Sequence, residues 1–253
     1  MKTNKKDLNI VIPMSGEGTS FIQAGYTFPK PLIDINGKPM VQLVIENLIP
    51  KKGFRFIFIP KKEHYDKYSL HQIFNNIAKG NFVALPQLAP TQGAACSVLN
   101  AVDYINNEEE LVIANADQII DVDINKFIQF ARKSKADGVI MTFNSHHPRW
   151  SYARVDKKGN VLEVAEKKVI SNQATVGIYY FRQGADFVKA AFSMIEKNIR
   201  FNNDFYVCPI FNELILEGKS IINWEIKQSQ MHGLGTPEDL AKYLNLAERK
   251  GKK

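Results

Sequence analysis

Short, continuous apolar runs alternate with amphipathic stretches through the first half of this chain. Residues 54–59 and 111–116 are rich in β-branched and aromatic side chains, as expected for strands that are covered on both faces. Between them, residues 40–48 place their apolar side chains on one helical face, directly after Pro39, a residue suited to the first helical position. This alternation predicts an α/β fold with a Rossmann-like, mostly parallel mixed sheet flanked by helices.

The rest of the chain continues the pattern, with more strands and fewer helices toward its end. Strands are predicted at 9–14, 54–59, 82–85, 111–116, 138–143, 152–156, 161–164, 174–181 and 221–227. Helices are predicted at 40–48, 64–76, 93–105, 124–131, 184–197, 205–216 and 237–250. The later strands indicate a small β-rich lid packed beside the sheet.

Composition excludes several classes of protein. The chain has 253 residues, 45% of them apolar, and a formal net charge of +7, which suits anionic ligands. No helix carries a basic face with interleaved aromatics, so nucleic acid is not an expected partner. No apolar run approaches the roughly 18 residues of a membrane span, and no signal peptide is evident, so a cytoplasmic location is expected. Cys96 and Cys208 form no metal-ligand or redox spacing and are interpreted as reduced core residues.

The strand at 9–14 runs directly into a loop, residues 15–20, that contains two glycines. Gly16 and Gly18 leave backbone N–H groups open to a phosphate at the carboxyl end of the strand, although an ordinary strand-to-helix turn would use the same residues. Lys30 lies between two prolines about ten residues later and is a positioned cation. Together these features predict a site for a nucleoside triphosphate.

Asp117 directly follows the predicted strand 111–116. A carboxylate at this edge of a sheet suits Mg²⁺, and a turn aspartate that caps its own backbone is the alternative. Because a predicted phosphate-binding loop precedes Asp117 in the chain, the metal interpretation of Asp117 is favoured. Asp121 and Asp123 also form the Asp-x-Asp pattern of glycosyltransferases, but Asp123 precedes the helical pattern that starts at Ile124 and is better interpreted as an N-cap.

Three further segments could complete a site. Gln92 could hydrogen-bond the edge of a base and Gly93 could let the base lie flat, with tight helix packing as the alternative. Glu166 and Lys167 follow a strand and could hold a hydroxyl or amine and a phosphate, or form a solvated surface pair. The loop 145–152 mixes cations with aromatic side chains and could line an acceptor pocket.

The motifs, taken in order, resemble those of the nucleotidyltransferases, or pyrophosphorylases, that activate sugar 1-phosphates. The resemblance rests on the glycine loop, Pro-Lys-Pro-Leu at 29–32, Gly-Lys-Pro-Met at 37–40, Asp117, the Glu166-Lys167 pair, Gly-Ile-Tyr at 177–179 and Gly-Thr-Pro-Glu-Asp-Leu at 235–240. It covers nearly the whole chain. It implies the GT-A-like nucleotidyltransferase fold, and an enzyme that transfers a nucleoside monophosphate from an NTP to a phosphorylated acceptor with release of pyrophosphate.

The resemblance also implies roles for individual residues. Lys30 and Asp117 would be catalytic, with Asp117 binding Mg²⁺ as the cofactor. Gly16 and Gly18 would hold the triphosphate, Gln92 and Gly93 would touch the base, and Glu166, Lys167 and Gly177 would bind the acceptor. From their places in the glycine loop and in the 145–152 loop, we also expect the nucleotide to contact Met14, Ser15, Glu17, Thr19 and Ser20 and the acceptor to contact Tyr152. The chain would be a single domain, with a nucleotide-binding half at about 1–137, an acceptor-binding half at about 138–235 and a C-terminal helix at 236–253.

Two positions depart from the family pattern. Ser20 stands where the family usually has arginine, and Gly233, beside His232, stands where many members have a second metal-binding aspartate. Asp204 or water would then supply the second ligand, or the metal would be bound more weakly.

The acceptor and the reaction class have open alternatives. A sugar 1-phosphate is the default acceptor, and related enzymes of this fold that activate phosphoglutamine or phosphocholine with CTP make CTP the first choice of nucleotide, for surface polysaccharide or capsule precursors. A glycosyltransferase that uses Asp121 and Asp123, and a nucleotide-binding protein without activity, are the alternatives. The sequence is compatible with a homo-oligomer and does not determine the oligomeric state.

Overall fold

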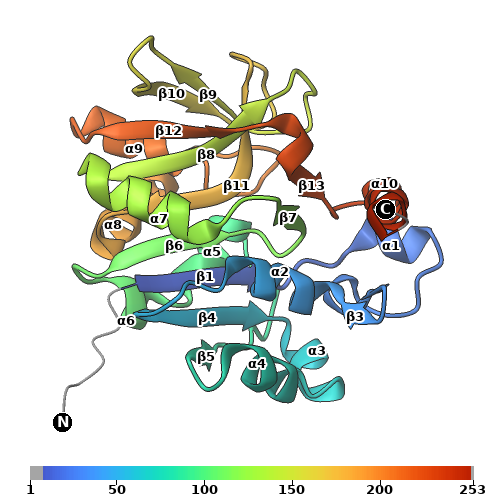
Figure 1. The fold of residues 1–253 in the computed structure, drawn as a ribbon. Coiled ribbons are helices and arrows are strands. Elements are labelled where there is room, and N and C mark those ends of the chain that lie inside the picture. The colour runs from blue at the N-terminus through green and yellow to red at the C-terminus, as the bar shows by residue number, and fades with distance from the viewer. Residues whose placement is uncertain (1–7, 252–253) are drawn as a thin grey trace.

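A computed structural model describes residues 8–251 of the chain, and its centre is one mixed sheet (Figure 1). The nine strands of this sheet, as far as the described residues go, are β1 (Leu8–Met14), β4 (Phe54–Pro60), β5 (Phe82–Ala84), β6 (Glu110–Ala114), β8 (Gly138–Asn144), β9 (Tyr152–Val155), β10 (Val161–Ala165), β11 (Gln173–Phe181) and β12 (Ile221–Ile226). Their order is β10-β9-β11-β6-β1-β4-β5, and β8 joins β11 to β12. The α/β fold predicted from the sequence is confirmed.

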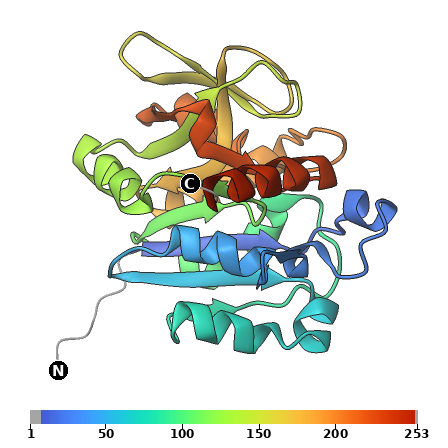
Figure 2. The same cartoon turned by 45° about the vertical axis from the view of Figure 1, so that its right-hand side comes forward.

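The first half of the chain forms the parallel part of the sheet. β1 lies between β6 and β4 and is parallel to both, and β5 extends the sheet beyond β4. Because side chains alternate along β4, Phe56 and Phe58 enter one core, whereas Ile57 and Ile59 enter a second core on the opposite face. Helices cover both faces, which explains why these strands are apolar throughout (Figure 2).

One core contains α2 (Met40–Leu48), α4 (Leu70–Ala78), α7 (Ile124–Ser134) and part of α10 (Pro237–Gly251); the other contains α5 (Ala94–Leu99), α6 (Val102–Ile105), α8 (Gly184–Glu196) and α9 (Ile210–Leu216). Stacked rings of Phe58 and Phe74, with centroids 4.2 Å apart, join β4 to α4. The segment 252–253 of the predicted C-terminal helix lies outside the described residues.

Three predicted helices were wrong in extent. The helix predicted at 64–76 is α3 (Lys62–Lys67) followed by α4, because Ser69 adopts φ of 49° and only α4 has a buried face. The helix predicted at 93–105 is likewise divided into α5 and α6. The helix predicted at 205–216 begins only at Ile210, because the N–H of Phe205 donates to the carbonyl of Gln92 instead of continuing a helix.

The predicted helix starts were correct at two of three places. Asp123 accepts a hydrogen bond from the N–H of Asn125 at 2.9 Å, so its N-cap interpretation is confirmed. Pro237 is the first residue of α10, and the hydroxyl of Thr236 accepts the N–H of Asp239 at 3.2 Å. Pro39, however, precedes its helix with ψ of 142° and belongs to β3 (Lys38–Pro39), which pairs with β2 (Asp34–Ile35).

The β-rich part of the second half extends the central sheet rather than forming a separate layer. The hairpin of β9 and β10 lies at the end of the sheet, where Ala174 of β11 pairs with Tyr152 of β9 (Figure 1). β11 is antiparallel to both β6 and β8, and therefore connects the two halves of the chain through backbone hydrogen bonds. The β-rich part that the sequence predicts beside the sheet is thus continuous with the sheet.

A small second sheet brings the C-terminal segment to the carboxyl edge of the parallel strands. β7 (Gln118–Ile120) pairs with β13 (Met231–Gly233), which follows the short 3-10 helix η2 (Gln228–Gln230). The N–H of Leu234 donates to the carbonyl of Asp117 at 2.7 Å. This edge is where ligands bind in open α/β sheets. Within residues 8–251, no helix combines the length and the apolar character that crossing a membrane requires.

Candidate active site

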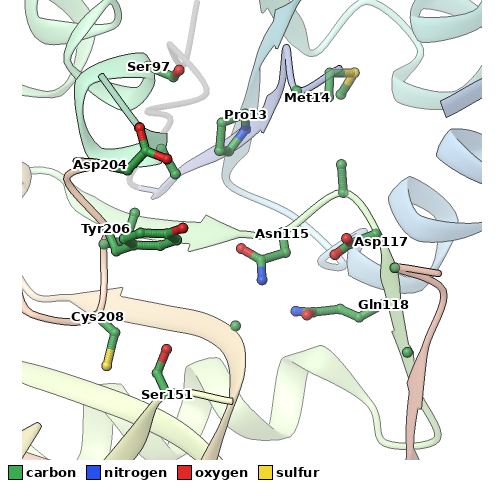
Figure 3. Close-up of a pocket in the computed structure, with 18 of the residues that line it drawn as sticks. Pro13, Met14, Ser97, Asn115, Asp117, Gln118, Ser151, Asp204, Tyr206 and Cys208 are labelled. Atoms are coloured by element: carbon green, nitrogen blue, oxygen red, sulfur yellow. The ribbon is translucent and has the colours of Figure 1, made fainter. Parts of the chain in front are cut away.

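A cavity of about 800 Å³ opens at the carboxyl edge of the sheet. Its walls come from the loop after β1, the loop between β6 and β7, the bulged middle of β11 and the segments near residues 150, 166, 205 and 235. Figure 3 shows the side chains of Asn115, Ser151 and Tyr206, which come from separate parts of the chain, directed into one space. Its volume is within the usual range for small-molecule sites.

The loop after β1 offers free backbone donors to this cavity. The N–H groups of Gly16, Glu17 and Gly18 donate no hydrogen bond to any described residue. A side chain on Gly16 would meet nothing within 4 Å, so packing within the protein does not require glycine there. Gly18 has φ of 66° and precedes α1 (Thr19–Gln23). A loop with open N–H groups and no obstructing side chain suits an anion such as phosphate.

Lys30 and Asp117 form an ion pair although 87 residues separate them in the sequence. Lys30 begins the short helix η1 (Lys30–Leu32), and its Cβ lies 3.1 Å from where a Cβ on Gly18 would stand. The side chains of Lys30 and Asp117 are 22% and 29% exposed, so an incoming ligand can reach both. The structure therefore brings the predicted loop, cation and carboxylate together.

The donor set at Asp117 fits a magnesium ion only if the substrate supplies most of the ligands. Within residues 8–251, no group of three or more His, Cys, Asp or Glu side chains could hold a metal. Gly235 lies beside Asp117, where a Cβ would stand 3.3 Å from the Oδ2 atom, whereas Gly233 pairs with Gln118 and faces Trp150 and Asp239. Asp204 lies across the cavity from Asp117 (Figure 3), so it does not supply the expected second carboxylate there. Mg²⁺ is often held by one carboxylate together with substrate phosphates and waters.

Glu166 and Lys167 bind Ser151 and Tyr206, which lie across the cavity from Asp117 (Figure 3). The hydroxyl of Ser151 donates to Glu166 Oε2 at 2.5 Å, and burial raises the pKa of the Glu166 carboxyl above its usual value. Lys167 Nζ donates to the hydroxyl of Tyr206 at 3.0 Å. The pair is therefore not a solvated surface pair. Burial also raises the pKa of the nearby Cys208 thiol, so this cysteine stays protonated at neutral pH.

Some predicted site residues lie elsewhere. Tyr152 is fully buried, its hydroxyl donates to the carbonyl of His147 at 2.8 Å, and it does not line the cavity. Gln92, Thr19 and Ser20 are exposed and also do not line it. Met14, Ser15, Gly16, Glu17, Gly18, Gly93, Glu166, Lys167 and Gly177 do line it.

Gly93 has a packing role that accounts for its presence. Its φ is 105°, and a Cβ there would stand 2.5 Å from the carbonyl oxygen of Phe205. The start of α5 can therefore approach the segment at 204–205 only because residue 93 has no side chain. Packing alone therefore requires glycine at this position, and contact of Gly93 with a base stays a prediction.

Polar side chains also occupy the wall between the loop and α5. Ser15 Oγ donates to Gln87 Oε1 at 3.0 Å, and the hydroxyls of Thr91 and Ser97 are 2.7 Å apart. Gln87 and Ser97 were not predicted from the sequence, because they come from a loop and from the interior face of a helix. Asn115 and Gln118, which flank Asp117 in sequence and line the cavity, were also not predicted.

The alternative Asp-x-Asp site lies outside the cavity. Asp123 caps α7, and Asp121 Oδ2 lies 3.1 Å from His232 Nε2. Neither aspartate is among the cavity-lining residues. From the 145–152 loop, Arg149, Trp150 and Ser151 line the cavity, in agreement with the expectation that this loop contributes to it.

The fold and the cavity define an α/β protein whose candidate ligand site lies at the carboxyl ends of parallel strands. The chain belongs to the nucleotidyl transferase family, whose family model matches residues 10–241. The resemblance drawn from the sequence motifs is therefore confirmed.

Individual relatives are distant. The chain is 26% identical over 192 residues to "Bifunctional protein GlmU" of Methanocaldococcus jannaschii, which covers 75% of this chain and 42% of that protein. It thus spans about two fifths of the length of the first curated relatives that it matches. It is also 26% identical over 188 residues to "2-aminoethylphosphonate cytidylyltransferase" of Lancefieldella rimae, covering 71% of this chain and 69% of that protein.

Solved structures share the fold. A nucleoside-diphosphate-sugar pyrophosphorylase from Vibrio cholerae RC9 superposes with a TM-score of 0.79 over 93% of this chain and 99% of that one, at 22% identity. This similarity supports the architecture described above, including the single mixed sheet.

Proposed function

We propose that this chain transfers a nucleoside monophosphate from an NTP to a phosphorylated small molecule and releases pyrophosphate. The observation that carries the proposal is the Lys30–Asp117 ion pair beside a loop with free N–H groups, in one cavity of about 800 Å³. Membership of the nucleotidyl transferase family supports the same reaction class.

In this reaction an oxygen of the acceptor phosphate attacks the α-phosphorus of the nucleotide. The bond from that phosphorus to the bridging oxygen breaks, and pyrophosphate leaves with the electron pair. The attacking phosphate is already anionic at neutral pH, so no protein base is needed. The protein must instead align two polyanions and offset their repulsion.

The charged residues of the cavity suit this task. Lys30 would contact the reacting phosphates, and the N–H groups of residues 16–18 would bind the triphosphate. Lys167 would attract the phosphate of the acceptor. Asp117 would hold a magnesium ion that arrives with the nucleotide, and such an ion offsets phosphate charge.

In this proposal the chain is one domain, with the nucleotide held by residues before about 138 and the acceptor by residues at about 138–235. CTP is the first choice of nucleotide, because one relative is named as a cytidylyltransferase. The acceptor is a sugar 1-phosphate or a non-sugar phosphate such as phosphoglutamine or phosphocholine, and the product would be a precursor for surface polysaccharide or capsule.

One assay tests the proposal. The protein is incubated with Mg²⁺, each of the four common NTPs and a panel of phosphorylated acceptors, pyrophosphate is measured, and the products are identified by mass. We expect one molecule of pyrophosphate for each molecule of nucleotidylated acceptor, and none when the metal is chelated. Release of a nucleoside diphosphate from a nucleotide sugar would indicate a glycosyltransferase, and binding of NTP without turnover would indicate a protein that has lost activity.

A further inference from the structure

Gln118 is a buried amide without a hydrogen-bond partner. Its side chain lines the cavity but is only 4% exposed, and its Nε2 atom has no partner within the described chain. Buried polar groups are nearly always hydrogen-bonded, because a desolvated donor without a partner costs free energy. An unpaired amide at the wall of a ligand cavity therefore points to a partner that arrives with the ligand.

Asn115 lies beside Gln118 and is also available. Its side chain is exposed to the cavity and makes no hydrogen bond with the described residues. Both amides are directed toward the middle of the cavity (Figure 3).

Gly177 makes room for these two amides. The pairing of β11 with β8 is irregular between Thr175 and Tyr179, and Gly177 within this bulge has φ of 86°. A Cβ on Gly177 would stand 2.3 Å from Asn115 Nδ2 and 2.7 Å from Gln118 Oε1. The bulge thus leaves space for the amide groups of Asn115 and Gln118, close to the part of the cavity proposed to bind the acceptor.

The aromatic side chains of the cavity disfavour a quaternary ammonium ligand. Such a cation binds over aromatic faces. The aromatic residues among the described cavity-lining set are Trp150, Tyr179 and Tyr206. The guanidinium of Arg149 lies 4.3 Å from the ring centroid of Trp150, and Lys167 Nζ lies 4.8 Å from that of Tyr206. Tyr179 is 5% exposed. Protein cations therefore already stack against the two accessible rings, which leaves less aromatic surface for another cation.

We propose that Gln118, together with Asn115, determines acceptor specificity by hydrogen-bonding a hydroxyl or carboxamide group of the acceptor. An amide both donates and accepts hydrogen bonds, as these two groups require. The inference rests on the proposed function and narrows its acceptor: a phosphate that carries hydroxyl or carboxamide groups is selected over one that carries a quaternary ammonium.

The test compares Gln118→Met with Gln173→Met. Methionine has a similar length but forms no comparable hydrogen bond. Gln173 is a matched control, because its Oε1 atom accepts from Thr142 Oγ1 at 2.7 Å and it does not line the cavity. Dissociation constants are measured by calorimetry for glucose 1-phosphate, phosphoglutamine and phosphocholine, in the presence of a non-hydrolysable NTP. The Tm of each ligand-free protein is measured as well.

We expect the wild type to bind glucose 1-phosphate or phosphoglutamine more tightly than phosphocholine. Gln118→Met weakens binding of the preferred acceptor by about 10–100-fold and leaves NTP affinity unchanged, because a lost hydrogen bond in a desolvated site has this magnitude. It also raises the Tm of the ligand-free protein by about 2–4 °C, since the unpaired amide is removed. Gln173→Met lowers the Tm and leaves acceptor affinity unchanged.

Four results would each overturn the proposal. The wild type could prefer phosphocholine or bind none of the probes. The Gln118→Met variant could keep the acceptor affinity of the wild type or have a lower Tm. Failure of the proposed function is a separate outcome: the wild type would bind an acceptor with the expected dependence on Gln118 but release no pyrophosphate.

Discussion

Replacement of Lys30 by methionine isolates the charge that the proposed reaction needs. Methionine keeps most of the apolar stem of lysine and removes only the ammonium group. In the protein this group pairs with Asp117, and both side chains are about a quarter exposed. Exposed or partly exposed ion pairs contribute at most about 1 kcal/mol to stability. We therefore expect Lys30→Met to remain folded, with a Tm within about 4 °C of the wild type.

The expected loss of activity is much larger than the loss of stability. A unit charge about 4 Å from a phosphate oxygen, at an effective dielectric constant of about 20, contributes about 4 kcal/mol. If this attraction acts mainly on the charge that develops as pyrophosphate leaves, its loss slows the reaction about 10³-fold.

The assay is initial-rate pyrophosphate release with saturating acceptor and varied NTP. Lys38→Met is the matched control, because Lys38 lies in the same region of the chain but pairs with Glu46 at 2.8 Å, away from the cavity. It should retain the wild-type rate. A folded Lys30→Met protein with more than a tenth of the wild-type kcat/KM would refute the role assigned to this lysine.

Three other substitutions test separate parts of the account. Asp117→Asn should lower turnover by about 10²–10³-fold while the protein stays folded, and calorimetric affinity for Mg²⁺-NTP equal to the wild type would argue against a metal at this carboxylate. Gly177→Ala should lower the free energy of unfolding by roughly 2–5 kcal/mol in urea titrations. The added Cβ would stand at a position with positive φ, 2.3 Å from Asn115 and 2.7 Å from Gln118. A variant as stable as the wild type would show that the bulge adapts freely. Burial raises the pKa of Glu166, so the folded wild type binds this proton more tightly than the unfolded chain does. The wild type therefore loses stability as the pH rises from the pKa of the unfolded chain to that of the folded protein. The Tm of Glu166→Gln minus the Tm of the wild type should increase from about pH 4 to pH 7, and a constant difference would contradict the assignment.

Much of the fold was predictable because burial on both faces leaves a direct mark on sequence. β4 and β6 are apolar at nearly every position, and such runs identify central strands without any knowledge of their neighbours. The helix boundaries were less accessible. Ser69 interrupts one amphipathic stretch with a left-handed conformation that no local rule demands, and the start of α9 depends on a hydrogen bond between Phe205 and Gln92.

The site divides in the same way. Gly16, Gly18, Lys30 and Asp117 lie at positions that strand ends and motif order already mark, and the structure brings them together. Tyr152 follows a polar loop and resembled a pocket residue, but its side chain turns into the core.

Gln118 shows the opposite case. It begins β7 and is buried, and only the absence of a hydrogen-bond partner in three dimensions distinguishes it from an ordinary interior residue.

A crystal structure with Mg²⁺ and a non-hydrolysable CTP analogue tests the central claim most directly. The account predicts that the triphosphate accepts hydrogen bonds from the backbone of residues 16–18 and lies within 4 Å of Lys30, with the metal on Asp117. A triphosphate bound outside this cavity, with Lys30 and Asp117 still paired only to each other, would contradict it.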